Sequence, residues 1–64
     1  MIYIKKKRER IGKTQQQLAD EVGVSIVMIS QYENGRYMPS AEKLPKLAKA
    51  LGCTIDELYR EEVS

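Results

Sequence analysis

The chain has 64 residues, a net charge of +2 and 42% hydrophobic residues, which suffices for one small folded domain. It contains one cysteine and no histidine, so an internal disulfide is excluded, and neither a metal site nor histidine-based catalysis is expected. The apolar start, residues 1–4, is too short for a signal peptide or a membrane span, so we expect a cytoplasmic protein with no membrane contact, cofactor or small-molecule site.

The first predicted helix covers residues 2–11, where Ile4, Arg8 and Ile11 recur at three- and four-residue spacing. An arginine on an apolar stripe needs an acidic partner, because an unpaired charge at the edge of a core is unfavourable. Gly12 and Lys13 then end the helical pattern. Pairing of residues 1–4 as a short extended arm stays an open alternative.

The second predicted helix begins at a capping box. Thr14 and Gln17 have the T-x-x-Q spacing in which side chain and backbone satisfy each other's unpaired groups at a helix start. Leu18 and Val22 lie four residues apart and form the apolar face of this helix.

A tight turn separates the second helix from the third. Gly23 is suited to the left-handed residue that ends a helix, and Ser25 is suited to cap the next helix, over residues 26–34. The small side chain of Ala19 allows the two helices to approach closely. Three residues supply the inner face of the third helix: Val24, Ile29 and Tyr32. This pattern is typical of a helix-turn-helix, whose second helix can enter the major groove of DNA.

The chain after the turn at Asn34 and Gly35 predicts a fourth helix. Ser40 is a candidate cap, but Pro45 cannot donate to a carbonyl four residues back, so regular helix is expected only from about Lys43. The expected inner face consists of Leu44, Leu47, Ala48 and Leu51, and Gly52 ends the helix.

A fifth, short helix is predicted from a second capping box, at Thr54 and Glu57, with Ile55 and Leu58 turned inward. Five short helices with brief connections indicate a compact all-α domain over residues 1–60, followed by a short tail over residues 61–64.

The charges alternate in sign along the chain. Residues 1–13 carry +5, residues 14–35 carry −3, residues 36–51 carry +3 and residues 52–64 carry −3. The two basic blocks flank the helix-turn-helix pattern, where cations can hold phosphates. Lysine and arginine also cover ordinary helix surfaces, so the charges support the motif without establishing it.

Residues 4–59 resemble the Cro/phage-repressor type of helix-turn-helix domain, also called XRE-like. The resemblance is carried by the motifs R-x-R-I-G-K-T-Q-x-x-L-A-x-x-V-G-V-S, I-S-Q-Y-E-N-G-R, P-S and L-A-K-A-L-G. It implies a five-helix fold and a sequence-specific transcriptional regulator of the repressor kind. The implied partner is double-stranded DNA with an inverted-repeat operator, bound by a homodimer.

The resemblance also implies roles for individual residues. The third helix is the recognition helix, and its base-contacting positions are Ile26, Val27, Ser30 and Gln31. The positions that lie near the DNA backbone are Gln15, Asn34, Arg36 and Ser40. Arg8 and Glu33 match an ion pair that ties the first helix to the end of the recognition helix.

Three residues depart from the family pattern. Ile26 and Val27 stand where hydrogen-bonding residues are frequent, and Lys13 stands where an apolar residue is commoner, so weaker packing is expected there. Pro45 interrupts the usual start of the fourth helix.

Residues 26–29 form an unbroken apolar run that cannot all face the core, because successive helical residues are about 100° apart. Ile29 is expected inside, whereas Val27 and Met28 are expected to point outward and to contact thymine methyl groups. Ordinary surface apolarity and a protein-binding patch are the two alternatives. The amide of Gln31 is suited to bond adenine.

The sequence bears on two other classes of function. A protein-interaction module of the same fold, antitoxin-like or co-regulatory, would use the surface over residues 26–28. An enzyme is not expected, because the serines have no base to activate them and the acids lie beside bases.

Overall fold

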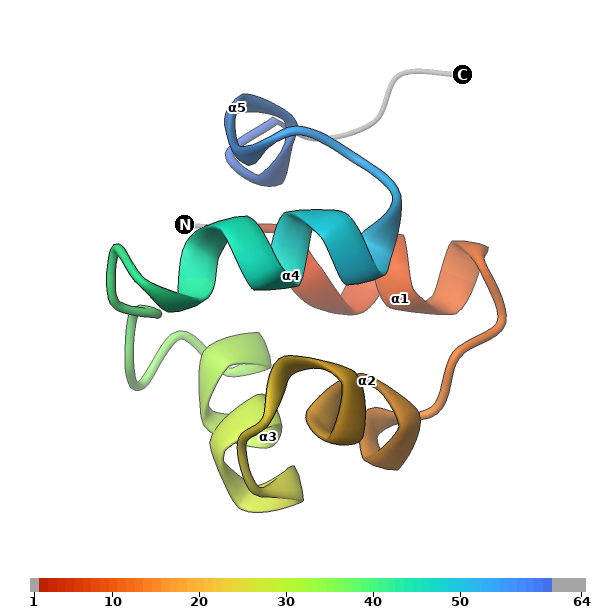
Figure 1. The fold of residues 1–64 in the computed structure, drawn as a ribbon, viewed down its shortest axis with the longest axis vertical. Coiled ribbons are helices and arrows are strands. Elements are labelled where there is room, and N and C mark those ends of the chain that lie inside the picture. The colour runs from red at the N-terminus through yellow and green to blue at the C-terminus, as the bar shows by residue number, and fades with distance from the viewer. Residues whose placement is uncertain (1, 61–64) are drawn as a thin grey trace.

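The computed structural model describes residues 2–60, and the expected tail over residues 61–64 lies outside them. The described chain contains five helices and no strand, so the all-α, five-helix prediction is confirmed. In chain order the helices are α1 (Ile4–Arg10), α2 (Gln15–Val22), α3 (Ile26–Glu33), α4 (Lys43–Leu51) and α5 (Ile55–Leu58) (Figure 1). No helix of the described residues is both long and apolar enough to cross a membrane.

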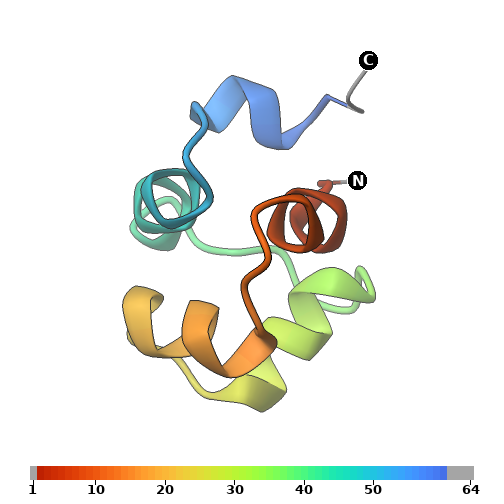
Figure 2. The same cartoon turned by 90° about the vertical axis from the view of Figure 1, so that its right-hand side faces the viewer.

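The helices are stacked in three layers. α1 and α4 lie side by side in the middle, and Figure 2 looks along both of them. The α2–α3 pair lies on one side of this middle layer and α5 on the other (Figures 1 and 2). α2 packs against both α3 and α4, while α1 packs against α3 and α4. The helix-turn-helix pair is thus supported on a platform made by α1 and α4.

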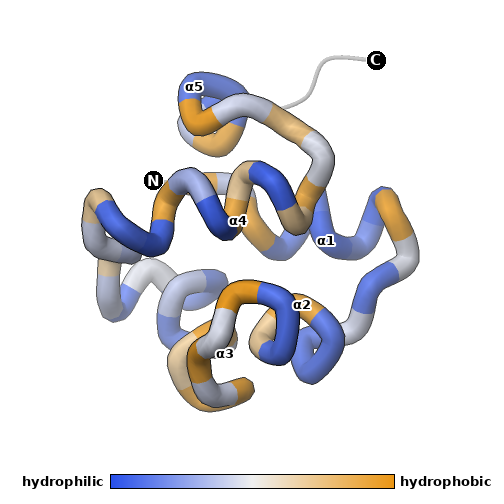
Figure 3. Tube along the Cα trace, in the orientation of Figure 1, coloured by the Kyte–Doolittle hydropathy of each residue, from blue (hydrophilic) through white to orange (hydrophobic). Residues whose placement is uncertain are grey.

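The core between these layers is built from apolar side chains of all five helices. Each helix contains both apolar and polar residues (Figure 3). The buried apolar residues are Ile2, Ile4, Leu18, Ala19, Val22, Ile29, Tyr32, Leu47, Ala48, Leu51 and Leu58. The predicted inner faces of α2 and α4 are therefore confirmed, with Leu44 only partly buried.

Both predicted capping boxes are present. The Thr14 hydroxyl accepts the Gln17 N–H at 3.0 Å, and the Gln17 side chain accepts the Thr14 N–H at 2.8 Å. The Thr54 hydroxyl accepts the Glu57 N–H at 3.1 Å, and the Glu57 carboxylate accepts the Thr54 N–H at 3.0 Å. Each box provides side-chain acceptors for two backbone N–H groups at the helix start, so α2 and α5 begin where the sequence predicts.

The start of α4 combines a turn and a proline. Ser40 accepts the Lys43 N–H with its carbonyl at 3.0 Å and with its hydroxyl at 3.4 Å, in a turn that precedes the helix. Pro45 is the third residue of α4, in the first turn, where its missing N–H has no partner inside the helix anyway. Regular helix from Lys43 is confirmed for this reason.

The first helix is shorter than predicted. It begins at Ile4, because Tyr3 remains outside it and donates its backbone N–H to the Leu58 carbonyl at 2.8 Å. The expectation that Ile11 lies on the inner stripe is wrong, because the helix ends at Arg10 and Ile11 is exposed. Lys7, one turn after Ile4, is buried instead.

Ile55 is a further correction. It was expected to turn inward together with Leu58, but its side chain is exposed while Leu58 is fully buried. α5 has only four residues, so a single position faces the core directly and its first residue points away.

Candidate nucleic-acid interface

The turn between α2 and α3 has the geometry that the sequence predicts. Gly23 adopts a left-handed backbone conformation with a φ of 82°, which a residue without a Cβ accepts without strain. Its N–H and that of Val24 both donate to the Ala19 carbonyl, at 2.8 and 3.0 Å. Ser25 accepts the Met28 N–H at 3.1 Å and thereby caps α3. Ala19 is fully buried beneath the crossing.

The third helix divides into an inner and an outer face. Ile29 and Tyr32 are buried, three residues apart. The four positions with expected base contacts lie on the other side, where Ile26 is 41% and Val27 is 62% exposed, and Ser30 and Gln31 are half-buried. Because they are spaced by one, three and four residues, these side chains occupy one continuous face of α3.

The expected outward direction of Met28 is wrong. This side chain is half-buried and packs against the core, together with Val24. It lines a groove of about 470 Å³ with Tyr32, Tyr37 and Met38, between α3 and the loop that follows it. The outward apolar surface of α3 therefore consists of Ile26 and Val27.

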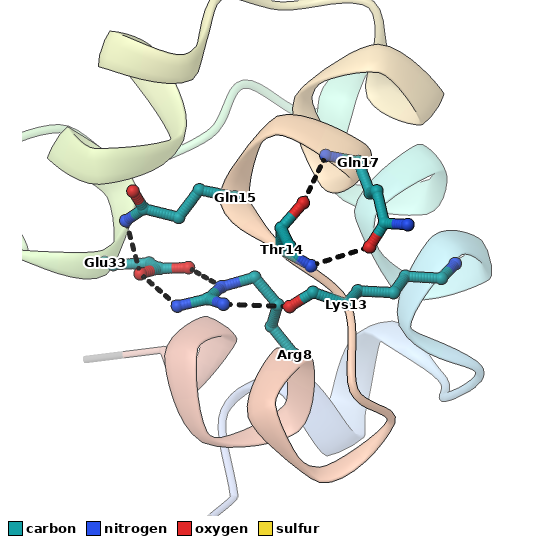
Figure 4. A network of polar contacts seen from close by, with 6 residues as sticks. All are labelled: Arg8, Lys13, Thr14, Gln15, Gln17 and Glu33. Carbon is teal, nitrogen blue, oxygen red and sulfur yellow. Dashed lines mark hydrogen bonds and ion pairs between the residues drawn. The ribbon is translucent and has the colours of Figure 1, made fainter.

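A polar network joins α1 to the end of α3 (Figure 4). Arg8 Nε donates to Glu33 Oε2 at 2.6 Å, and Arg8 Nη2 donates to Glu33 Oε1 at 3.2 Å. The third donor, Nη1, reaches the Lys13 carbonyl at 2.9 Å. The two side chains are only 12% and 4% exposed, so this pair is largely shielded from water. The hydrogen bond and the negative charge of Glu33 raise the pKa of Arg8 above its ordinary value.

Gln15 belongs to the same network. Its amide Nε2 donates to Glu33 Oε1 at 2.9 Å, which fixes the side chain at the start of α2 against the end of α3 (Figure 4). An amide nitrogen carries two hydrogens, and the bond to Glu33 uses one of them. The structure thus brings Gln15, Arg8 and Glu33 together, at the edge where α2 and α3 meet.

The remaining backbone-contact candidates lie in the chain that follows α3. Asn34 is the C-cap residue that follows α3, and its side chain is exposed. Arg36 and Ser40 are exposed as well. The Arg36 N–H donates to the Gln31 carbonyl at 3.0 Å, which holds the arginine close to the end of α3. Ser40 lies beyond the loop, at the turn before α4.

Lys13 differs from what the sequence predicts. Its ammonium donates to the Ala50 carbonyl at 2.7 Å and forms an ion pair with Glu21 at 2.7 Å. A side chain that was expected to weaken the packing at this corner therefore connects the last turn of α4 to α2. No sequence signal marks Ala50 as the partner, because the acceptor is a backbone carbonyl 37 residues away.

Comparison with known proteins gives consistent matches. A family model described as helix-turn-helix matches residues 4–58. The cryptic phage CTXphi transcriptional repressor RstR of Vibrio cholerae is 49% identical over 51 residues, which is 80% of this chain and 46% of that protein. The chain thus spans less than half the length of this relative.

Two solved structures of the c2 repressor of Salmonella phage P22 have the same fold. The solution structure of its DNA-binding domain matches with a TM-score of 0.88 and 39% identity, covering 95% of this chain and 80% of that one. The crystal structure of the c2 repressor in complex with a synthetic operator matches with a TM-score of 0.85 and 39% identity, covering 92% and 89%.

Proposed function

Because this chain belongs to the Cro/phage-repressor type of helix-turn-helix family, whose members are DNA-binding transcriptional regulators and not enzymes, we propose that it binds an inverted-repeat operator as a homodimer and represses transcription. In this proposal α3 is the recognition helix and enters the major groove. The relatives RstR and P22 c2 are both named repressors, and the c2 repressor has been crystallised with a synthetic operator.

The outer face of α3 is the observation that carries the proposal. It presents two exposed apolar side chains, Ile26 and Val27, beside two polar ones, Ser30 and Gln31. The major groove offers both thymine methyl groups and hydrogen-bonding base edges, so a face of this mixed kind is suited to read it. We assign Ile26 and Val27 to thymine methyl groups, and Gln31 to N6 and N7 of an adenine.

Phosphate contacts would fix the orientation of α3 in the groove. The second amide hydrogen of Gln15 and the exposed side chains of Asn34 and Arg36, all near the C-terminal end of α3, would make them. Ser40 is exposed and would add a hydroxyl donor from the turn before α4. Arg8 and Glu33 have a structural role, because their side chains are turned toward each other and shielded from water.

The homodimer follows from the size of one module. A recognition helix of eight residues reads few base pairs, so two copies on two half-sites are needed for useful affinity and specificity. We place the regulator in the cytoplasm, where bacterial and phage operators are accessible.

Selection from a randomised pool of DNA duplexes, at two salt concentrations, tests this function. We expect an inverted repeat with half-site centres about one helical turn apart, with thymines in each half-site, and with affinity falling steeply as salt rises. Enrichment of no sequence, with weak salt-sensitive binding only, would reduce the proposal to non-specific DNA binding. Absence of binding at both concentrations would favour a protein-interaction module that uses Ile26 and Val27.

The substitution Gln31→Ala tests the readout separately. We expect about a tenfold loss of affinity for the selected duplex and a relaxed preference at one position of each half-site, with an unchanged salt dependence. The matched control is Gln16→Ala, on the exposed side of α2, where the amide donates to Asp20 at 2.9 Å. An unchanged base preference in the Gln31 variant would refute the assignment of Gln31.

A further inference from the structure

We propose that Lys13 is a positioning residue for DNA binding: its ammonium ties the last turn of α4 to α2 and thereby holds the start of α2 in register with α3. The inference rests on the proposed function, because it concerns the geometry of the same DNA-binding surface. In this role Lys13 positions the start of α2 and does not itself contact a DNA phosphate.

The ammonium of Lys13 has partners on two helices. It donates to the Ala50 carbonyl at 2.7 Å and contacts both carboxylate oxygens of Glu21, at 2.8 and 2.7 Å. Ala50 is the last residue but one of α4. Backbone carbonyls in the last turn of a helix accept no hydrogen bond from the helix itself, so they are available to other donors. A cation there also interacts favourably with the helix dipole. Two of the three ammonium hydrogens are therefore engaged inside the protein.

The aliphatic stem of Lys13 lies along α2. Lys13 precedes α2, whereas Glu21 lies in its last turn, eight residues later, so the side chain extends along α2 toward α4. Only 28% of this side chain is exposed. The stem of Lys13 is thus mostly shielded from water, and its charge is satisfied at the far end, which explains how it occupies a corner where an apolar residue is commoner.

Hydrogen bonds connect Lys13 to the proposed DNA-binding surface. The backbone carbonyl of the same residue accepts Arg8 Nη1 at 2.9 Å, Arg8 holds Glu33 with two further bonds, and Glu33 accepts the amide of Gln15 at 2.9 Å. A continuous set of polar contacts therefore runs from the end of α4 through Lys13 to the end of α3 and back to the start of α2 (Figure 4 shows the part from Lys13 to Gln15).

Lys13 directly precedes the start of α2, so these polar contacts affect where that helix begins. Thr14 caps α2 and Gln15 is the first residue of that helix, so any shift of Lys13 moves both directly. The phosphate contact of Gln15 and the base contacts of α3 must be made together on one duplex. A displacement of the α2 start relative to α3 therefore weakens DNA binding even when the fold is retained.

The test compares the unmodified chain with Lys13→Met, which keeps an unbranched apolar stem and removes the ammonium. The probe is the duplex that the unmodified chain selects from the randomised pool, and binding is measured well below the unfolding transition of both proteins. We expect about a three- to tenfold loss of affinity with an unchanged slope of affinity against salt. Amide chemical shifts of the free variant should change at Gln15 and Glu33, which are not neighbours of the substituted ammonium.

Two comparisons separate positioning from loss of charge. Lys49→Met removes the same charge from an exposed site in the last turn of α4, and it should weaken binding less than Lys13→Met does. Glu21→Gln keeps Lys13 and removes its ion pair, and it should bind about twofold more weakly than Asp20→Asn, which removes a neighbouring exposed acid. The Glu21 variant carries the test if Lys13→Met does not fold, and Lys13→Arg should restore most of the affinity.

The measurements distinguish a failure of the positioning role from a failure of the proposed function. A Lys13→Met variant that melts at a lower temperature but binds the duplex with unchanged affinity, and leaves the Gln15 and Glu33 amide shifts in place, would overturn the positioning role and leave the proposed function intact. A salt slope that falls by about one phosphate would show direct contact of Lys13 with DNA and would also overturn it. Failure of the unmodified chain to bind any duplex would refute the proposed function, and the inference with it.

Discussion

Two arginine–carboxylate pairs at opposite sides of the molecule differ in almost everything but their chemistry. Arg8 and Glu33 are 25 residues apart, join α1 to α3, and have side chains that are 12% and 4% exposed. Arg60 and Asp56 are four residues apart at α5, with side chains that are 73% and 70% exposed. The contact distances are similar, at 2.6 and 2.9 Å.

The difference shows that burial and sequence separation decide what an ion pair does. Water and salt screen the pair at α5. Its attraction is therefore nearly cancelled by the entropy lost when two side chains are held in one geometry, and its net contribution to stability is small. The α1–α3 pair is shielded, and it also carries Gln15 and the Lys13 carbonyl as further partners. Removing one member leaves the other buried with a charge and no counter-ion, which is strongly unfavourable.

The largest expected effect is that of Glu33→Ala. We expect a loss of about 3–5 kcal/mol in the free energy of unfolding, because Arg8 stays in place without its partner and Gln15 loses its acceptor. Urea denaturation followed by circular dichroism measures it. Asp56→Ala is the matched control, and equal losses in the two variants would contradict the comparison.

A double replacement sharpens the comparison further. Arg8→Met combined with Glu33→Met removes both charges and keeps apolar volume at the joint. We expect this variant to be only about 1 kcal/mol less stable than the unmodified chain, and more stable than either single variant. If the double variant is as unstable as Glu33→Ala, the pair stabilises the fold by more than the neutralisation of one buried charge by the other. Operator affinity should still fall, since Gln15 is no longer held against α3.

The smallest effect on stability is expected for Arg60→Ala. The change in the free energy of unfolding should be within about 0.5 kcal/mol, and it should vanish in about 1 M salt, where charges are screened within a few ångström. Thermal unfolding at two salt concentrations measures both. A loss comparable to that of Glu33→Ala would mean that exposure does not separate the two pairs.

The pH dependence differs between the same two regions. Hydrogen bonds from the backbone and side chain of Thr54 lower the pKa of the Glu57 carboxyl at the start of α5, so its contribution to stability is present above the pKa of the unfolded chain and is lost as the pH falls through the folded value. The pKa of Arg8 is raised by Glu33, so its contribution is present at neutral pH, where both groups are charged, and on the alkaline side it is lost only in strongly alkaline solution. An NMR titration should place the Glu57 pKa below the ordinary value for glutamate, and Glu57→Gln should flatten the acid limb of the stability profile. An ordinary pKa for Glu57 would contradict the role of this cap.

Much of the fold could be predicted because the relevant interactions are local. The capping boxes at Thr14 and Thr54 and the left-handed turn at Gly23 each involve residues at most four positions apart. The periodicity of apolar residues located the inner faces of α2 and α4 for the same reason. The outward position of Val27 and the inward position of Ile29 followed from the helical repeat alone.

Predictions for single side chains are wrong where burial depends on the end of a helix or on what packs against it. Ile11 is exposed because α1 ends one residue earlier than predicted, and Ile55 is exposed because it is the first residue of a single-turn helix. Met28 is half-buried because it packs against the core, as Val24 does. The spacing of apolar residues within one helix determines neither of these.

The sequence by itself therefore determined the starts of α2 to α5, the turn between α2 and α3 and the family of the chain, because those depend on neighbouring residues and on short motifs. Only the tertiary structure decided that the Lys13 ammonium meets Ala50 and that Gln15 shares Glu33 with Arg8, whose pairing with Glu33 the family resemblance had implied. These contacts join residues 18 to 37 positions apart, and their partners include backbone carbonyls that no side-chain pattern marks. Such contacts exist only once α1 and α4 have packed into the layer that supports the helix-turn-helix pair.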